Sequence, residues 1–332
     1  MEVVKVETEL QAWKLLDALL SGEQTAPKEP LLFDIKKWAN VHIYLPDTPI
    51  EGSISPTMMK AFLELQEAIN RTYTLVSADT TDLRHLTNIE RNNLEFRVKV
   101  EKGSSGYTID LGEIVQKIGI EAVSKMTPEM LMYTVLGTAL IVGGTAMFKS
   151  WLAAKTEDRK SQVDLEKTKE MLSVQREAIS QGTENVRIMA ELFKKVPILN
   201  DIEAVTSVAR GQIVKSVGDE GGGKLFDTNV DSELAAEVTT QIRQQSSDVV
   251  LKGNYKVVRV DTSVSDGFSV KLLNENDGSE VTASLLDALV SQKHKSAIQE
   301  AEWGKGLVYV EIKARKINNR IIDAIITDAK PV

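Results

Sequence analysis

The first 126 residues of this 332-residue chain mix the two periodicities that distinguish strands from helices. Residues 1–7 alternate between apolar and polar side chains, as a short strand does. Thr8 and Gln11 have the spacing of a capping box and precede an amphipathic helix. Residues 94–111 contain two alternating segments around a glycine- and serine-rich turn, which predicts a β-hairpin. We therefore expect a small α+β domain over residues 1–126.

The longest uncharged run in the chain is Met130–Phe148, and it has the largest effect on the predicted class of protein. A helix rises about 1.5 Å per residue, so about 20 apolar residues cross the roughly 30 Å core of a bilayer. Thr127 and Pro128 are typical of a helix start, because threonine caps free amide groups and proline fits the first turn. We expect one apolar helix over residues 127–150 that spans a membrane. The alternative is a helix buried in the core of a soluble oligomer.

Two sets of side chains in and around this run indicate what it contacts. Aromatic and basic residues near its ends suit the two membrane interfaces. These interface residues are Tyr133, Lys149 and Trp151. Small residues inside the run allow helices to approach closely. These helix-association residues are Gly137, Ala139, Gly143 and Gly144. Because most nearby basic residues follow the run, the positive-inside rule places the C-terminal part in the cytoplasm.

Residues 151–217 are predicted to form a helical stalk. Apolar residues recur there every seven positions, at Leu165, Leu172, Ile179, Val186 and Phe193. The second heptad position is less apolar, so the pattern leaves two structures open. One is a parallel coiled coil, and the other is a solvated helix that packs a single stripe on its own protein.

Residues 218–248 begin with a glycine-rich stretch and continue as a helix, which we interpret as a hinge followed by a helix. Gly218 to Lys224 have most of the spacing of a phosphate-binding loop. Leu225, however, stands where Ser or Thr would hold magnesium, and two acidic residues lie where phosphates would bind. We therefore do not expect nucleotide binding at this loop.

In residues 249–332 the pattern predicts three strands, a helix and two further strands, over residues 255–260, 268–273, 280–284, 285–303, 307–316 and 320–327 in that order. This β-β-β-α-β-β order is that of a five-stranded OB-type barrel, in which a helix lies between the third and fourth strands. We expect such a barrel, with a generic α+β sheet as the alternative. The predicted fold class is therefore α+β, with an apolar helix, a helical stalk and a C-terminal OB-like barrel.

Composition limits the chemistry that the chain can carry out. There is no cysteine, and the net charge of −8 argues against a chain-wide nucleic-acid surface. His42, His85 and His294 are isolated from one another in the sequence, without metal-ligand spacing or a nucleophile partner. We therefore predict a protein that is not an enzyme and has no metal or cofactor. Residues 249–332 carry 12 Lys and Arg against 11 Asp and Glu, so their field is weak.

Basic residues of this barrel are the candidate contacts for an oligonucleotide or a similar ligand. They are Lys256, Arg259, Lys271, Lys313, Arg315 and Arg320. Only a few aromatic residues are available to stack bases, and some of them must fill the core. Protein binding therefore explains the barrel at least as well as nucleic-acid binding does.

These features predict a membrane-tethered, self-associating protein that couples a soluble sensing domain to assembly at a membrane. A role in bacterial stress or phage defence would suit this layout. The expected partners are membrane lipid, further copies of the chain and, through the barrel, nucleic acid or another protein. The alternative is a cytoplasmic, oligomeric binding or structural subunit whose barrel binds nucleic acid or protein.

Overall fold

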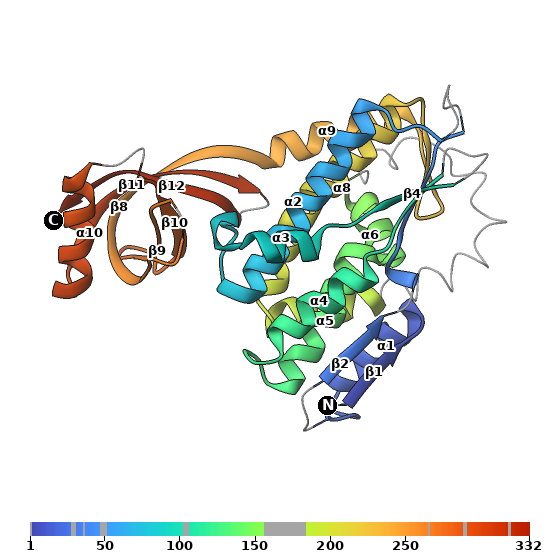
Figure 1. The fold of residues 1–332 in the computed structure, drawn as a ribbon, viewed down its shortest axis with the longest axis horizontal. Coiled ribbons are helices and arrows are strands. Elements are labelled where there is room, and N and C mark those ends of the chain that lie inside the picture. Colours follow the sequence, from blue (N-terminus) through green and yellow to red (C-terminus); the bar gives the residue numbers. More distant parts are fainter. Residues whose placement is uncertain are drawn as a thin grey trace, which may run out of the picture. The chain divides into compact units, whose positions relative to one another are not determined.

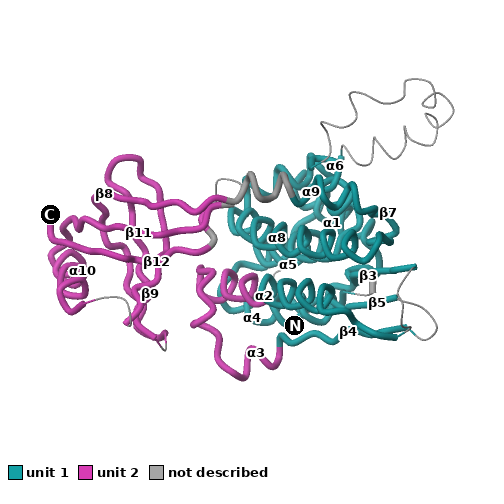
Figure 2. Tube along the Cα trace, turned by 90° about the horizontal axis from the view of Figure 1, so that it is seen from above, with its two compact units in different colours: residues 1–69, 94–242 teal, residues 70–93, 243–332 magenta. Residues whose placement is uncertain are grey.

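The computed structural model describes residues 2–27, 31–35, 37–46, 52–101, 106–155, 184–264, 266–287, 291–317 and 320–332. The chain forms two compact units (Figure 2). Unit 1 comprises Met1–Ile69 and Leu94–Ile242, and unit 2 comprises Asn70–Asn93 and Arg243–Val332. This division differs from the predicted segments, because a piece of the N-terminal region belongs with the C-terminal strands.

Unit 1 is a mixed α+β unit in which helices accompany two small sheets (Figure 1). A parallel pair, β1 with β2, forms one sheet, and the antiparallel order β4-β5-β3-β6-β7 forms the other. The strands are β1 (Glu2–Val6), β2 (Leu31–Ile35), β3 (Val41–Tyr44), β4 (Val98–Val100), β5 (Gly106–Ile109), β6 (Gly223–Leu225) and β7 (Thr228–Val230). The helices are α1 (Glu9–Leu20), α4 (Gly112–Ala122), α5 (Pro128–Gly143), α6 (Thr145–Lys155) and α8 (Ile198–Asp219). Helices α2 (Pro56–Ala78) and α9 (Ser232–Gln245) begin in unit 1 and end in unit 2.

Local patterns in the N-terminal region are confirmed. The Gln11 amide donates to Thr8 Oγ1 at 3.2 Å, so Thr8 caps the helix as predicted. Gln11 Oε1 accepts from the Glu7 amide at 2.7 Å and not from the Thr8 amide, so the reciprocal half of the predicted capping box is displaced by one residue. Strands β4 and β5 pair antiparallel, as the predicted hairpin requires. Thr127 also caps α5 as expected, since its side chain accepts from the Met130 amide.

The apolar run does not form the single helix that we predicted. It breaks at Gly144 into α5 and α6, whose axes are bent by 60°. Among the described residues, no single helix has the length and apolarity needed to cross a bilayer, although α5 and α6 meet the criteria when taken together. Every residue of α5 from Leu131 to Gly143 is buried in unit 1.

Charged side chains from distant parts of unit 1 satisfy the helix ends at this break. Glu9 accepts from the Thr145 and Ala146 amides at 3.0 and 2.9 Å, so its carboxylate caps the positive end of α6. Arg210 on α8 donates to the Ile141 carbonyl near the C-terminal end of α5. Free backbone groups at helix ends need partners when they are buried. The bend between α5 and α6 is therefore stabilised by specific contacts within unit 1 and is not an irregularity of a single helix.

The region predicted as a stalk and a hinge contributes to the core of unit 1. Helix α8 buries most of its length and packs against α5, so this part of the predicted stalk is not a solvated helix. Residues 184–195 are also helical, whereas Leu165, Leu172 and Ile179 lie outside the described residues. The glycine-rich stretch is a turn between α8 and β6, with Gly221 and Gly222 at positive φ. The glycine-rich stretch therefore connects two elements of unit 1.

Unit 2 contains the predicted barrel, and it is closed. The strand order is β10-β12-β11-β8-β9, with one parallel contact between β10 and β12. The strands are β8 (Ser246–Asp261), β9 (Phe268–Asn274), β10 (Glu280–Leu285), β11 (Leu307–Ile317) and β12 (Arg320–Pro331). Helix α10 (Gln292–Gly304) lies between the third and fourth strands in sequence. Inward-facing apolar residues of all five strands form one core with the buried face of α10.

A second part of unit 2 comes from the N-terminal region. The end of α2 is followed by the short 3₁₀ helix η2 (Leu83–His85) and by α3 (Asn88–Leu94). We call residues 78–85 the inserted segment, because they lie against the barrel strands within unit 2. Its contacts show which of the residues predicted to bind a ligand already have protein partners.

Candidate functional site

Three of the six basic residues predicted to bind a ligand contact protein groups on the outer face of the barrel. Arg259 on β8 donates to the Ala78 carbonyl at 3.2 Å. Lys271 on β9 forms ion pairs with Asp79 at 3.2 Å and with Glu280 at 3.0 Å. These hydrogen bonds and charges raise the pKa of Lys271, with the Glu280 hydrogen bond as the largest cause. Lys271 is therefore paired with two carboxylates, and Arg259 already donates a hydrogen bond to a protein carbonyl.

The third cation, Arg315 on β11, shares an acidic partner with α2. Its guanidinium lies 3.0 Å from Asp323 on β12, and Arg71 on α2 contacts the other oxygen of that carboxylate. His85 in the inserted segment lies 3.9 Å from Asp261 at the end of β8. At these two contacts an acidic group of the barrel lies beside a basic group of residues 70–93. At Lys271 the signs are reversed, because a basic group of the barrel pairs with an acidic group of the inserted segment.

Asp82 and Arg84 anchor the inserted segment at β9 and β10. The Ser284 hydroxyl on β10 donates to Asp82 at 3.0 Å. Arg84 donates to Asp82 and also to the carbonyls of Asp266 and Phe268 at the start of β9. Burial acts to raise the pKa of Asp82, but the hydrogen bonds and charge of Arg84 outweigh it and the pKa is lowered. Asp82 is therefore an ionised, nearly buried anchor.

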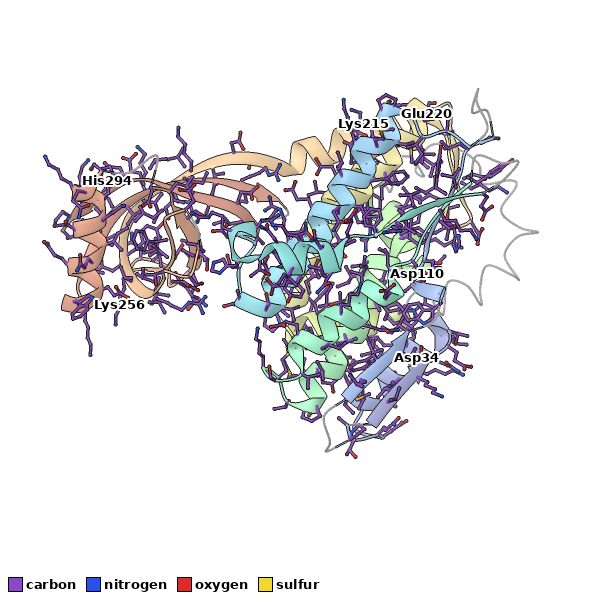
Figure 3. The ribbon with its side chains drawn as sticks, in the orientation of Figure 1. Asp34, Asp110, Lys215, Glu220, Lys256 and His294 are labelled. Atoms are coloured by element: carbon purple, nitrogen blue, oxygen red, sulfur yellow. The ribbon has the colours of Figure 1, made fainter. Side chains whose placement is uncertain are left out.

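Among the described residues, two other predicted cations, Lys256 and Lys313, form no ion pair with the inserted segment. Lys256 and Lys313 are exposed on β8 and β11, and Figure 3 shows Lys256 at the edge of the barrel. The side chain of Arg320 lies outside the described residues. Among the five whose side chains are described, only Arg259, Lys271 and Arg315 therefore contact groups that neutralise them or accept their hydrogen bonds. The sequence did not predict the role of the inserted segment, because its partners in the barrel are more than 170 positions away in the chain.

A pocket of about 300 Å³ opens between α10 and the barrel strands. Phe268, Leu285 and Ile298 contribute apolar side chains to its lining, and Trp303 flanks it with 81% of its surface exposed. Lys295 lies over the Phe268 ring at 5.5 Å and pairs with Asp287 at 2.6 Å. An exposed tryptophan beside an apolar pocket is typical of a protein-binding surface.

A second pocket of about 330 Å³ lies over the five-stranded sheet of unit 1. Its lining is polar and includes His42, whose Nδ1 lies 3.1 Å from Thr108 Oγ1, and Glu101. Within the described residues there is no group of three or more His, Asp or Glu side chains placed to hold a metal ion. We find no arrangement of nucleophile, base and orienting group in this lining.

The predicted helix-association residues are used inside unit 1. A Cβ on Gly143 would lie 2.3 Å from the Ala39 carbonyl oxygen, and one on Gly137 would lie 2.7 Å from the Leu199 side chain. Ala139 is fully buried, and a Cβ on Gly144 would meet the Leu140 carbonyl. Gly143 and Gly137 therefore let α5 approach Ala39 and α8 within its own unit, whereas Gly144 lies against the preceding turn of α5.

The predicted membrane-interface residues have different surroundings. Tyr133 is buried and donates to the Leu19 carbonyl at 3.1 Å. Trp151 is buried too, and its indole N–H donates to Ser207 at 2.9 Å. Lys149 is exposed. Both aromatic residues therefore serve as polar anchors of the unit 1 core.

Comparison with known proteins gives no relative: no family model, no curated protein and no solved structure matches this chain.

Proposed function

We propose that this chain is a non-enzymatic binding and scaffolding protein whose barrel has an OB-like fold and holds polypeptide on its outer strand face. The strand connectivity and the position of α10 support the OB-like assignment. In OB folds the second and third strands and the loop between the first two strands form the ligand-binding face. Here β9, β10 and the loop at Asp266 correspond to that face, and they contact the inserted segment.

The single observation that carries this proposal is the identity of the groups on the strand face. Lys271, Arg259 and Ser284 bind carboxylates or a carbonyl of residues 78–82, where a nucleic-acid ligand would place phosphates. Charges of both signs alternate across the contact, which suits a polypeptide ligand better than a uniformly anionic nucleic-acid strand. The nearly balanced charge of residues 249–332 points the same way.

The surroundings of α5 favour the second of the two roles left open by the sequence, a binding or structural subunit. Membrane insertion would have to remove α5 from the core of unit 1 and expose Glu9 and Arg210 at the helix break. If Glu9 and Arg210 instead stayed at the break and entered the bilayer with it, each charge would cost about 3 kcal/mol on insertion scales. Burial of α5 within unit 1 has no such cost.

The test compares nucleic-acid binding and segment mobility in the full chain. Fluorescence anisotropy with single-stranded DNA and RNA of about 15 nucleotides, the upper site size of one OB fold, should show no saturable binding at low salt. Hydrogen exchange over residues 79–93 should accelerate in Lys271→Met but not in the matched control Lys313→Met. Saturable oligonucleotide binding that Lys271→Met abolishes, without any change in exchange, would overturn the proposal in favour of nucleic-acid recognition.

A further inference from the structure

One face of α10 forms a regular stripe beside the apolar pocket. Lys295, Ile298, Gln299, Glu302 and Trp303 all line the pocket. Their spacing of 0, 3, 4, 7 and 8 positions places them along one side of a helix. We call these five residues the α10 stripe.

The barrel holds this helix rigidly. Ala297, Ile298 and Ala301 are buried against the strands. Near the start of the helix, His294 Nε2 lies 3.1 Å from Asp328 on β12, and its Nδ1 accepts a hydrogen bond from the Ser291 amide (Figure 3). The exposed side chains of the stripe are therefore presented on a fixed scaffold, which lowers the entropy cost of binding.

The stripe contains both a projecting apolar group and a pocket to receive one. The exposed Trp303 indole is the projecting group, and Phe268 and Leu285 line the pocket beside it. A two-fold symmetric interface uses the same surface on both subunits, so that surface must be complementary to itself. A surface that carries both groups meets this requirement.

The charges of the stripe are self-complementary as well. Lys295 and Glu302 are seven positions apart, or about two helical turns. When two such helices pack antiparallel, Lys295 of each copy faces Glu302 of the other, and the exposed Gln299 side chains lie near the centre while Ile298 stays buried against its own barrel. Trp303 then lies opposite the start of the other helix, beside the pocket. Lys295 already pairs with Asp287, but an ammonium group has three donors and can bind a second carboxylate.

From this combination we infer that the α10 stripe is a dimer interface and that its occupant is the α10 stripe of a second copy of this chain. The inference is independent of the polypeptide-binding role of the strand face, because that face and the stripe use different residues. It also places self-association on unit 2, and not on the small residues of α5.

Sedimentation velocity of the full chain tests the inference. The wild type should form dimers in the micromolar range, and Trp303→Ala should raise the dimer Kd about thirtyfold, the effect of a typical tryptophan hot spot. The matched control Val250→Ser removes another exposed apolar side chain of the barrel, 53% exposed, and should leave the Kd unchanged.

Charge reversal gives a second, more specific arm. Lys295→Glu and Glu302→Lys each place like charges at both contacts, and each should raise the Kd about fivefold. The double variant should restore wild-type affinity. A mixture of the two single variants should form a heterodimer, since both contacts are then attractive. That rescue also shows that the single variants fold. A wild type that stays monomeric at about 100 µM, or dimers that none of these changes affects, would overturn the inference.

Discussion

Charged side chains have different roles in the two units. In unit 1, Arg210 and Glu203 form a 2.8 Å ion pair beside the helix break, and the Arg210 side chain is only 5% exposed. In unit 2, Lys271 pairs with an Asp79 side chain that is 63% exposed, on the outer face of the barrel. Breaking a buried pair leaves a charge without water or a partner, whereas a surface pair contributes little to the free energy of folding.

This difference indicates how permanent each arrangement is. The groups that satisfy the helix ends at the break in the apolar run are buried, and exposing them has a large free-energy cost. We therefore expect the bent arrangement of α5 and α6 to be lost only when unit 1 unfolds. The inserted segment is held by several individually weak ion pairs and hydrogen bonds, so its contact with the barrel should respond to salt and pH.

The largest effect is expected from Arg210→Met. The substitution leaves Glu203 without its ion-pair partner and removes the donor to the Ile141 carbonyl, so we expect a loss of about 3 kcal/mol in the free energy of unfolding. Urea denaturation measures this loss. Adding Glu203→Gln should recover part of the stability. Arg187→Met, which removes exposed ion pairs in the same unit, should leave the midpoint unchanged; an equal loss there would remove the distinction between buried and exposed pairs.

A smaller loss should follow from Gly143→Ala. The new methyl group would meet the backbone of Ala39, which cannot move easily, so we expect about 2 kcal/mol of destabilisation. Gly137→Ala is the control, because its methyl group meets only the mobile end of Leu199 and should cost about 1 kcal/mol. If both variants keep full stability and instead lose assembly, the small residues act between chains as first predicted from the sequence.

Removing the cap at the helix break should cost about 1 kcal/mol. Glu9→Ala leaves the Thr145 and Ala146 amides without their acceptor, and thermal unfolding monitored by circular dichroism reports the loss. Glu9→Gln keeps one acceptor oxygen and should cost less. Equal stability of all three proteins would show that the carboxylate does not hold the break.

The pH dependence of unit 2 should come partly from Asp82. Its pKa is lowered in the folded chain, so its contribution is present above the usual aspartate value of about 3.9 and is lost as the pH falls through the folded pKa. The stability difference between the wild type and Asp82→Asn should therefore shrink as the pH falls from 6 to 3. A difference that stays constant over this range would contradict the assignment of Asp82 as an ionised anchor.

The smallest effect is expected for the exposed pair between Lys271 and Asp79. A double-mutant cycle with Lys271→Met and Asp79→Asn should give a coupling energy below about 0.5 kcal/mol, and 1 M salt should reduce it further. A coupling above 2 kcal/mol that salt does not change would mean that this contact is as permanent as the buried pair in unit 1.

The sequence predicted the barrel well because alternation is a local signal. Strands β9 and β10 begin at the expected residues and extend one residue further. Strand β8 begins nine residues earlier than expected, at Ser246. Its first half lacks clear alternation, and its pairing with β11 from Ser246 to Lys256 supplies the order that the local pattern does not.

The break in the apolar run could not be predicted in the same way. The composition of residues 130–148 indicates that they are buried away from water, but it does not indicate whether lipid or protein surrounds them. The groups that fix the break, Glu9 and Arg210, lie 136 and 69 positions from the residues they contact. The same limit applied to the barrel cations, because a basic residue looks available until its acidic partner is found in another part of the chain.

Hydrogen exchange measured over the whole chain at low salt and at 1 M salt tests the contrast between the two units most directly. We expect salt to accelerate exchange over residues 79–93, whereas residues 130–148 should exchange only when unit 1 unfolds. Exchange over residues 130–148 that is as fast as in residues 79–93, or that slows only when lipid vesicles are added, would contradict it.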